Sequence, residues 1–315
     1  MDRTNVVKKP NGAIKLTKDM WKHRWLMGML LIGITYFVIF HYGPMYGVQI
    51  AFRDYQFRSG IWGSEWVGFD NFRKMFRSRA FIDVFRNTVI ISSYKLLFGF
   101  PAPIIFALLL NELKNKIFKR GIQSVSYLPH FLSWVVLGGI FKQILSPTTG
   151  TINYILNQIG IQPIYFLGNN DWFRTTLVFT SLWKEVGWGS IIYLAALSAI
   201  DPTLYEAAEI DGANRFQQAM KITIPGIMPI ICIQLIFWSG SIISDDFQQI
   251  FNLYNEAVYK TGDVLGTYIY RAGLVQMQYS YTAAVGLFRN IISLVIIIII
   301  NYATRLMGDE NYGIW

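Results

Sequence analysis

The sequence predicts an all-α integral membrane protein built from six transmembrane helices. More than half of the 315 residues are hydrophobic and only 15% are charged, a balance that soluble single domains rarely show. Apolar segments of the roughly 20 residues needed to cross a bilayer recur along the chain. A polar block over about 201–221 interrupts them. The six predicted spans cover about 25–46, 87–111, 122–145, 175–199, 222–244 and 283–306.

The first span follows a basic N-terminal segment, residues 1–24. The apolar run after Trp25 is too long for the h-region of a cleaved signal peptide, so we interpret it as a signal anchor. The basic residues of the segment include Lys8, Lys9, Lys15, Lys18, Lys22 and Arg24. The positive-inside rule places them in the cytoplasm. With six spans within 25–306, the tail over 307–315 is predicted to lie in the cytoplasm as well.

The loops between the first three spans carry two basic clusters. Lys114, Lys116, Lys119 and Arg120 lie in the second-to-third connection, which the same count of spans places in the cytoplasm. The outer loop over about 47–86 contains Arg73, Lys74, Arg77 and Arg79, although basic residues should be scarce there. Long loops obey the rule less strictly. We therefore expect this loop to fold as a small extracellular element rather than as a simple connection.

Prolines within or beside predicted spans include Pro44, Pro101, Pro103 and Pro225. A proline removes a backbone hydrogen bond and kinks a helix, which membrane helices tolerate when neighbouring groups satisfy the freed carbonyl. Such kinks could serve alternating access, or they could only shape the bundle.

The polar block over about 201–221 has the signals of a helix–turn–helix. Asp201 is a good N-cap and Pro202 a good first helical residue. Gly212 can adopt the left-handed conformation that ends a helix, and Asn214 can cap a second helix. Small side chains on one face would let a partner approach closely. Carboxylates in the block could pair with an Arg or Lys of that partner, although a solvated loop with ordinary charges would also contain them.

The spacing of Glu206-Ala207-Ala208, Gly212, Ile222 and Pro225 resembles the EAA loop of permease subunits in bacterial ABC importers, with Ile224 where that family usually has Leu. In the family this loop docks on the ATPase. The resemblance implies a coupling role for Glu206, Ala207, Ala208, Asp211, Gly212, Ala213 and Phe216.

A narrower resemblance extends over nearly the whole chain. It rests on HYGPMYG at 41–47, GFPAP at 99–103, YLPHFLSW at 127–134, WKEVGW at 183–188 and GIW at 313–315. These motifs are similar to those of the LplB-type group of carbohydrate permeases, related to the larger membrane subunit of the maltose importer. The resemblance implies import of oligosaccharides or polysaccharides across the bacterial cytoplasmic membrane. It also implies a second permease, two ATPase subunits that bind ATP and Mg²⁺, and an extracytoplasmic sugar-binding protein.

Candidates for a substrate path come mainly from the fourth and fifth spans, whose polar interruptions suggest a cavity or a protein neighbour. Sugars bind to aromatic faces and hydrogen-bonding side chains. The candidates are Tyr94, Trp183, Lys184, Trp188, Tyr193, Trp238, Asp245 and Asp246. Helical spacing places Lys184 and Trp188 on one face. It remains open whether Lys184 and Glu185 contact substrate, or instead lie near an interface or pair with the second permease.

Several function classes are not supported. Nothing matches the phosphate loop G-x-x-x-x-G-K-[ST], so ATP hydrolysis is expected in partner subunits and this chain is expected to be non-catalytic, without a bound cofactor. Cys232 is the only cysteine, and His23, His41 and His130 lack ligand spacing, so no metal site is predicted. The net charge of +9 comes from residues flanking spans rather than from a nucleic-acid surface. A permease for a non-sugar solute and a six-span secondary transporter remain alternatives.

Overall fold

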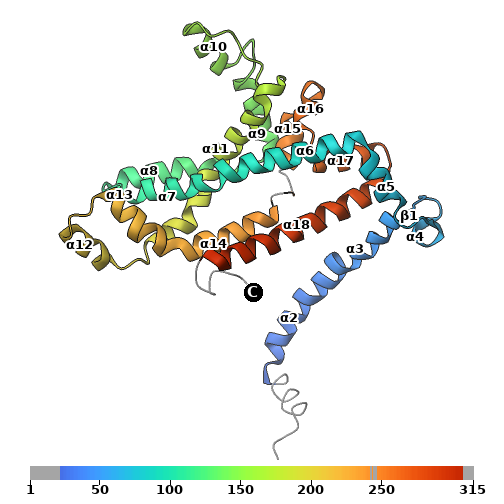
Figure 1. The fold of residues 1–315 in the computed structure, drawn as a ribbon, viewed down its shortest axis with the longest axis horizontal. Helices are drawn as coiled ribbons and strands as arrows, with labels where there is room; N and C mark the ends of the chain where they lie inside the picture. Colours follow the sequence, from blue (N-terminus) through green and yellow to red (C-terminus); the bar gives the residue numbers. More distant parts are fainter. Residues whose placement is uncertain (1–21, 242, 244–246, 308–315) are drawn as a thin grey trace, which may run out of the picture.

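The computed structural model describes residues 22–241, 243 and 247–307. Most of the basic N-terminal segment, the candidates Asp245 and Asp246, and nearly all of the C-terminal tail lie outside the described residues. Within those residues the chain is almost entirely helical, as predicted, and its long helices form an elongated bundle (Figure 1).

The first span is a continuous helical rod over 24–52, longer than the predicted 25–46. It consists of α2 (Arg24–Phe37), a π-helical turn (Val38–Tyr42), α3 (Gly43–Met45) and a 3₁₀ helix (Tyr46–Phe52). The rod diverges from the bundle in Figure 1, and its apolar window has no residue buried inside the chain. Such a surface requires lipid or another polypeptide to cover it.

The predicted outer loop does fold as a small element. Strand β1 (Arg53–Asp54) pairs antiparallel with β2 (Glu65–Trp66), and the two enclose α4 (Gly60–Gly63). Helix α5 (Asp70–Arg77) follows, and the amide of its buried Asn71 donates to the carbonyls of Ala51 and Arg53, both at 3.0 Å. These side-chain bonds hold the sheet against α5.

The second span is also one rod, made of α6 (Arg79–Tyr94), a π-helical turn (Lys95–Gly99) and α7 (Pro101–Asn111). Its π turn ends two residues before Pro101. The same offset separates the turn ending at Tyr42 from Pro44, and the turn ending at Thr223 from Pro225. A proline clashes with the carbonyl four residues earlier, and a widened π turn accommodates that carbonyl without ending the helix. These prolines therefore distort their spans but do not interrupt them.

The third span differs from its prediction as one helix over 122–145. Helix α8 (Lys116–Tyr127) and a short 3₁₀ helix (Leu128–Phe131) are followed by α9 (Trp134–Ile144), and the two parts are bent by 106°. The break has a local cause. Pro129 is the second residue of the 3₁₀ turn, and the Ser133 hydroxyl accepts a hydrogen bond from the N–H of Val136, which caps a new helix.

The later elements complete the bundle. Helix α10 (Thr151–Gln158) projects away from it, and α11 (Asn170–Leu197) crosses it (Figure 1). Then follow α12 (Pro202–Ile210), α13 (Arg215–Gln218), a π turn (Ala219–Thr223), α14 (Ile224–Ser241), α15 (Phe247–Leu253), a 3₁₀ turn (Glu256–Val258), α16 (Tyr259–Gly262), α17 (Leu265–Ile269), a π turn (Tyr270–Val275) and α18 (Tyr279–Met307).

Each of the six predicted spans corresponds to helix in the structure. By length and composition, four helices among the described residues can cross a membrane, and the bent pair α8–α9 is a fifth candidate. Helix α11 has 28 residues, a length of about 42 Å. It carries charged residues at Asp171, Arg174, Lys184 and Glu185, which lower its mean hydropathy. Length therefore supports a sixth span where apolar composition alone does not.

Helix α11 is the centre of the packing. It packs most extensively against α7 and also contacts α8 and α14. Its approach to α8 is very close, because a Cβ added at Gly187 would lie 2.2 Å from the carbonyl oxygen of Ser126. Only a glycine fits there, so the end of α8 rests directly on α11.

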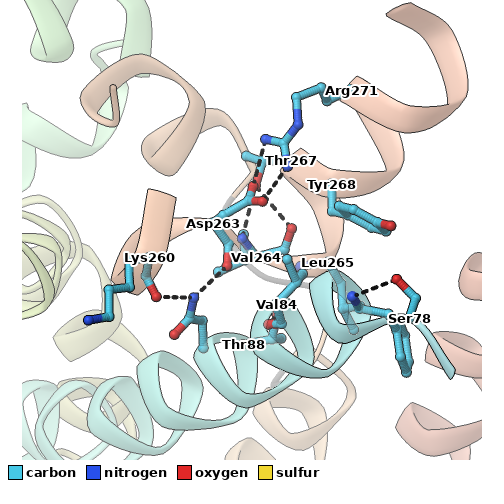
Figure 2. A network of polar contacts seen from close by, with 12 residues as sticks. Ser78, Val84, Thr88, Lys260, Asp263, Val264, Leu265, Thr267, Tyr268 and Arg271 are labelled. Atoms are coloured by element: carbon cyan, nitrogen blue, oxygen red, sulfur yellow. Dashed lines mark hydrogen bonds and ion pairs between the residues drawn. The ribbon is translucent and has the colours of Figure 1, made fainter. Parts of the chain in front are cut away.

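A buried polar network holds the segment over 256–269 in place (Figure 2). Asp263 accepts two hydrogen bonds from Arg271, at 3.1 and 2.5 Å, and one from Thr267 at 2.8 Å. The Asn87 amide of α6 donates to the Asp263 carbonyl, and Arg174 of α11 donates to Asn87 Oδ1 at 2.7 Å. This network joins α6, α11 and the segment before α18.

Candidate functional site

The polar block at 201–221 forms the predicted pair of short helices. The Asp201 carboxylate accepts a hydrogen bond from the N–H of Thr203 at 2.9 Å and caps α12, which begins at Pro202. The hydrogen bonds from Thr203 hold the pKa of Asp201 below its usual value. The cap is therefore ionised at neutral pH, as a stabilising charge at a helix N-terminus should be.

The turn between the two helices is also as predicted. Gly212 has φ +76°, and the N–H groups of Gly212 and Ala213 donate to the carbonyls of Glu209 and Ala208. This hydrogen-bond pattern is a Schellman motif. Asn214 and Gln217 then form a reciprocal capping box at the start of α13. Local signals alone account for this geometry.

The block presents an exposed surface. In Figure 1 α12 extends from the end of the bundle, and none of its residues is buried. Ile210 and Phe216 are 87% and 75% exposed, which is unusual for apolar side chains in so polar a segment. Glu206 is exposed too, whereas Glu209 pairs with Arg215 at 3.4 Å. The hydroxyls of Tyr205 and Thr223 lie 3.0 Å apart and tie α12 to the π turn that leads into α14.

A second constellation lies where the break between α8 and α9 meets α11. The imidazole of His130 stacks on Trp188, with ring centroids 4.6 Å apart and planes within 4° of parallel. His130 Nδ1 lies 2.8 Å from Glu185 Oε2. Lys184, only 6% exposed, donates to the His130 carbonyl at 2.6 Å and lies 3.4 Å from Glu185. Lys184 and Glu185 therefore pair with each other and with His130 within the chain.

Beside this constellation is a cavity of about 220 Å³. It brings together three of the predicted path residues, Trp188, Tyr193 and Trp238, which come from α11 and α14. Its other lining residues are Gly99, Phe100, Pro103, Glu185, Gly189 and Gln234. Aromatic faces beside a carboxylate and an amide are a suitable combination for a polyhydroxylated ligand, since they supply both apolar contact and hydrogen bonds.

The other predicted path residues lie elsewhere. Trp183 lines a separate cavity of about 730 Å³ against α8. Lys184 points to the His130 backbone and is not in the cavity wall. Tyr94, at the end of α6, is not in the wall either.

Sequence reasoning missed His130. The three histidines have no metal-ligand spacing, so the sequence does not single out His130, whose partners are on a helix 54 to 58 positions further along the chain. A usable signal was present: an imidazole in one predicted span and an ionisable pair in another are expected to meet, because each is costly to leave alone in a membrane.

The comparisons with known proteins agree with this architecture. The family model for the binding-protein-dependent transport system inner membrane component matches residues 99–309. The chain is 43% identical to Protein LplB of Bacillus subtilis (strain 168) over 290 residues, which cover 92% of this chain and 91% of that protein. It is 39% identical to the polygalacturonan/rhamnogalacturonan transport system permease protein YteP of the same strain, over 97% of this chain and 95% of YteP.

Among solved structures, the chain is similar to one from a bacterial ABC transporter involved in the import of the acidic polysaccharide alginate. The TM-score is 0.88 and the identity 41%, over 94% of this chain and 100% of that one. A second structure, of the alginate transporter in complex with an alginate pentasaccharide-bound periplasmic protein, matches with a TM-score of 0.87, over 94% of this chain and 99% of that one. This chain is a member of the family of binding-protein-dependent transport system inner membrane components.

Proposed function

We propose that this chain is the permease subunit of an ABC importer that moves oligosaccharides or polysaccharides across the bacterial cytoplasmic membrane. The observation that carries the proposal is similarity over nearly the whole chain to YteP, described as a polygalacturonan/rhamnogalacturonan permease, and to the alginate transporter. Both similarities exceed 35% identity and neither is restricted to one motif.

The block at 201–221 is proposed as the site where ATPase subunits dock. Support comes from its exposed apolar side chains, Ile210 and Phe216, and from the bond between Tyr205 and Thr223 that links α12 to α14. A displacement of the block would therefore be transmitted to a spanning helix. ATP and Mg²⁺ would be bound by two ATPase subunits, and this chain would be a non-catalytic transport subunit.

Two further partners complete the proposal. The first is a second, different permease, which would close the translocation path and cover apolar surface such as that of α2. The other is an extracytoplasmic sugar-binding protein, supported by the alginate transporter, whose solved complex includes a ligand-bound periplasmic protein. ATP binding at one end and saccharide delivery at the other would then bias the same conformational equilibrium.

The orientation in the membrane is testable with single cysteines. In a Cys232→Ser background, cysteines at Lys15 and Lys116 should resist an impermeant thiol reagent applied to intact cells, because the positive-inside rule places both in the cytoplasm. Arg58→Cys, at an exposed position of the outer element, should be labelled and serves as the control. Labelling at Lys15→Cys or Lys116→Cys in intact cells would show that the orientation is inverted.

The proposed path is tested by Trp188→Ala. Loss of an aromatic stacking surface is expected to raise the KM for saccharide uptake about three- to tenfold, with normal complex assembly. Trp183→Ala is the matched control, since this tryptophan is on the same helix and equally exposed, 43% against 42%, but lines the other cavity. The KM of both variants is measured from saccharide uptake by reconstituted complexes. Equal kinetics for the two variants would assign the Trp188 face to packing.

A further inference from the structure

We propose that His130 is a positioning residue for the translocation path: it sets the orientation of Trp188 in the cavity wall from the break between α8 and α9. This inference rests on the proposed function, because it assigns Trp188 a contact with saccharide. His130 itself is absent from the lining of that cavity, so its effect must act through its neighbours on α11.

The ring contacts show how the orientation is set. His130 covers one face of the Trp188 indole in a nearly parallel stack, and Phe131 packs edge-on against the same indole at 5.3 Å and 80°. Two consecutive residues of the 3₁₀ turn thus hold the Trp188 ring in one rotamer. Trp188 also lines the cavity, so the part of its side chain turned to the cavity is available to a ligand. Without the imidazole, the Trp188 side chain would regain rotational freedom, and a ligand would have to restrict it on binding.

The imidazole is itself fixed from α11. Its Nδ1 donates to Glu185 Oε2 at 2.8 Å, which sets the rotation of the ring about its side-chain bond. Glu185 is placed in turn by Lys184 Nζ, 3.4 Å from its other oxygen, and that ammonium lies 5.8 Å from the centroid of the Trp134 ring at the start of α9. Charge is balanced locally, because the Lys184 ammonium offsets the Glu185 carboxylate.

The bend of the chain does not depend on the imidazole. Lys184 donates to the backbone carbonyl of His130, which any residue at this position retains. The close contact of Gly187 with the Ser126 backbone is likewise independent of the His130 side chain. Substitutions at 130 should therefore leave the fold and complex assembly intact. This separation makes a positioning role testable apart from a structural one.

The test is a double-mutant cycle on reconstituted importer, with alginate oligosaccharides and oligogalacturonate as transport probes. His130→Ala should raise KM by the same three- to tenfold factor as Trp188→Ala, and the double variant should be no worse than either. His130→Phe restores a stacked ring and should return KM to within about twofold of the starting protein. Additive effects of His130→Ala and Trp188→Ala, or an unchanged KM in His130→Ala, would overturn the proposal.

A second measurement needs no substrate. The emission of Trp188 is obtained as the difference between the chain and its Trp188→Phe variant. Its acrylamide quenching should increase in the His130→Ala background, where the indole face covered by the imidazole is open, and return to the starting value in His130→Phe. Unchanged quenching would refute the positioning role. If quenching changes but Trp188→Ala transports normally, the path assignment in the proposed function fails instead, and His130 only orders a packing contact.

Discussion

Replacing Gly212 by valine is expected to lower saccharide uptake about tenfold while ATP hydrolysis continues. Gly212 has φ +76°, a conformation that costs an ordinary residue about 1–2 kcal/mol and a β-branched residue more. A Cβ there meets open space, so the effect is purely one of backbone conformation. Strain of that size shifts the population of the docking geometry about tenfold. Uptake and ATPase activity of reconstituted complexes, measured together, report the uncoupling.

Two control variants separate this effect from general destabilisation. Gly212→Asn should retain coupling, since asparagine tolerates the left-handed region. Gly160→Val introduces the same strain at φ +80°, also in open space, but in the loop after α10. It should not separate uptake from hydrolysis. Normal uptake by Gly212→Val would remove the basis for assigning a coupling role to the turn.

Replacing Asp263 by alanine is expected to lower the free energy of unfolding by about 3–5 kcal/mol. The Asp263 side chain is nearly inaccessible, and it accepts hydrogen bonds from the two terminal guanidinium nitrogens of Arg271 and from the hydroxyl of Thr267 (Figure 2). Removing it leaves the guanidinium without its counter-ion in a largely buried site, which is the costly way to break such a pair. Denaturant unfolding in detergent, followed by circular dichroism, measures the loss.

The matched control is an exposed pair of the same two residue types. Asp70 and Arg73 lie 3.0 Å apart on α5, and both side chains are more than half exposed. Asp70→Ala should therefore cost no more than about 1 kcal/mol. Asp263→Asn keeps a hydrogen-bond acceptor for Thr267. Its loss in the free energy of unfolding should therefore lie between those of Asp263→Ala and Asp70→Ala. Losses of similar size for Asp263→Ala and Asp70→Ala would contradict the view that the network in Figure 2 holds the segment over 256–269.

The block at 201–221 was predictable because each of its signals acts over a few residues. Asp201 caps the helix it precedes, Gly212 ends that helix, and Asn214 caps the next one. Apolar segment length likewise located the long helices, since lipid imposes a minimum length on any helix that crosses it. Among the described residues, four of them meet that test by length and composition, or five with the bent pair α8–α9. The fold and family expectations were confirmed on this basis.

The break at 128–133 was not predicted, although its causes are local. The apolar composition of residues 122–145 is equally compatible with one straight helix and with two helices joined at a bend. Pro129 and Ser133 distinguish the two cases only when Ser133 acts as an N-cap. A proline does not by itself predict a break in a span, because Pro44, Pro101 and Pro225 follow π turns and remain within continuous helices.

The sequence by itself indicated an all-helical membrane fold, the approximate positions of its long helices, the conformation of the block at 201–221 and the family. Only the tertiary structure decided which of the candidate path residues share a cavity: it placed Trp188, Tyr193 and Trp238 in one wall and Trp183 in another. It also brought His130 to Glu185, 55 positions away. Helical periodicity assigns residues to faces of one helix, but the rotation of each helix against its neighbours depends on packing between residues far apart in the chain, such as Gly187 against Ser126.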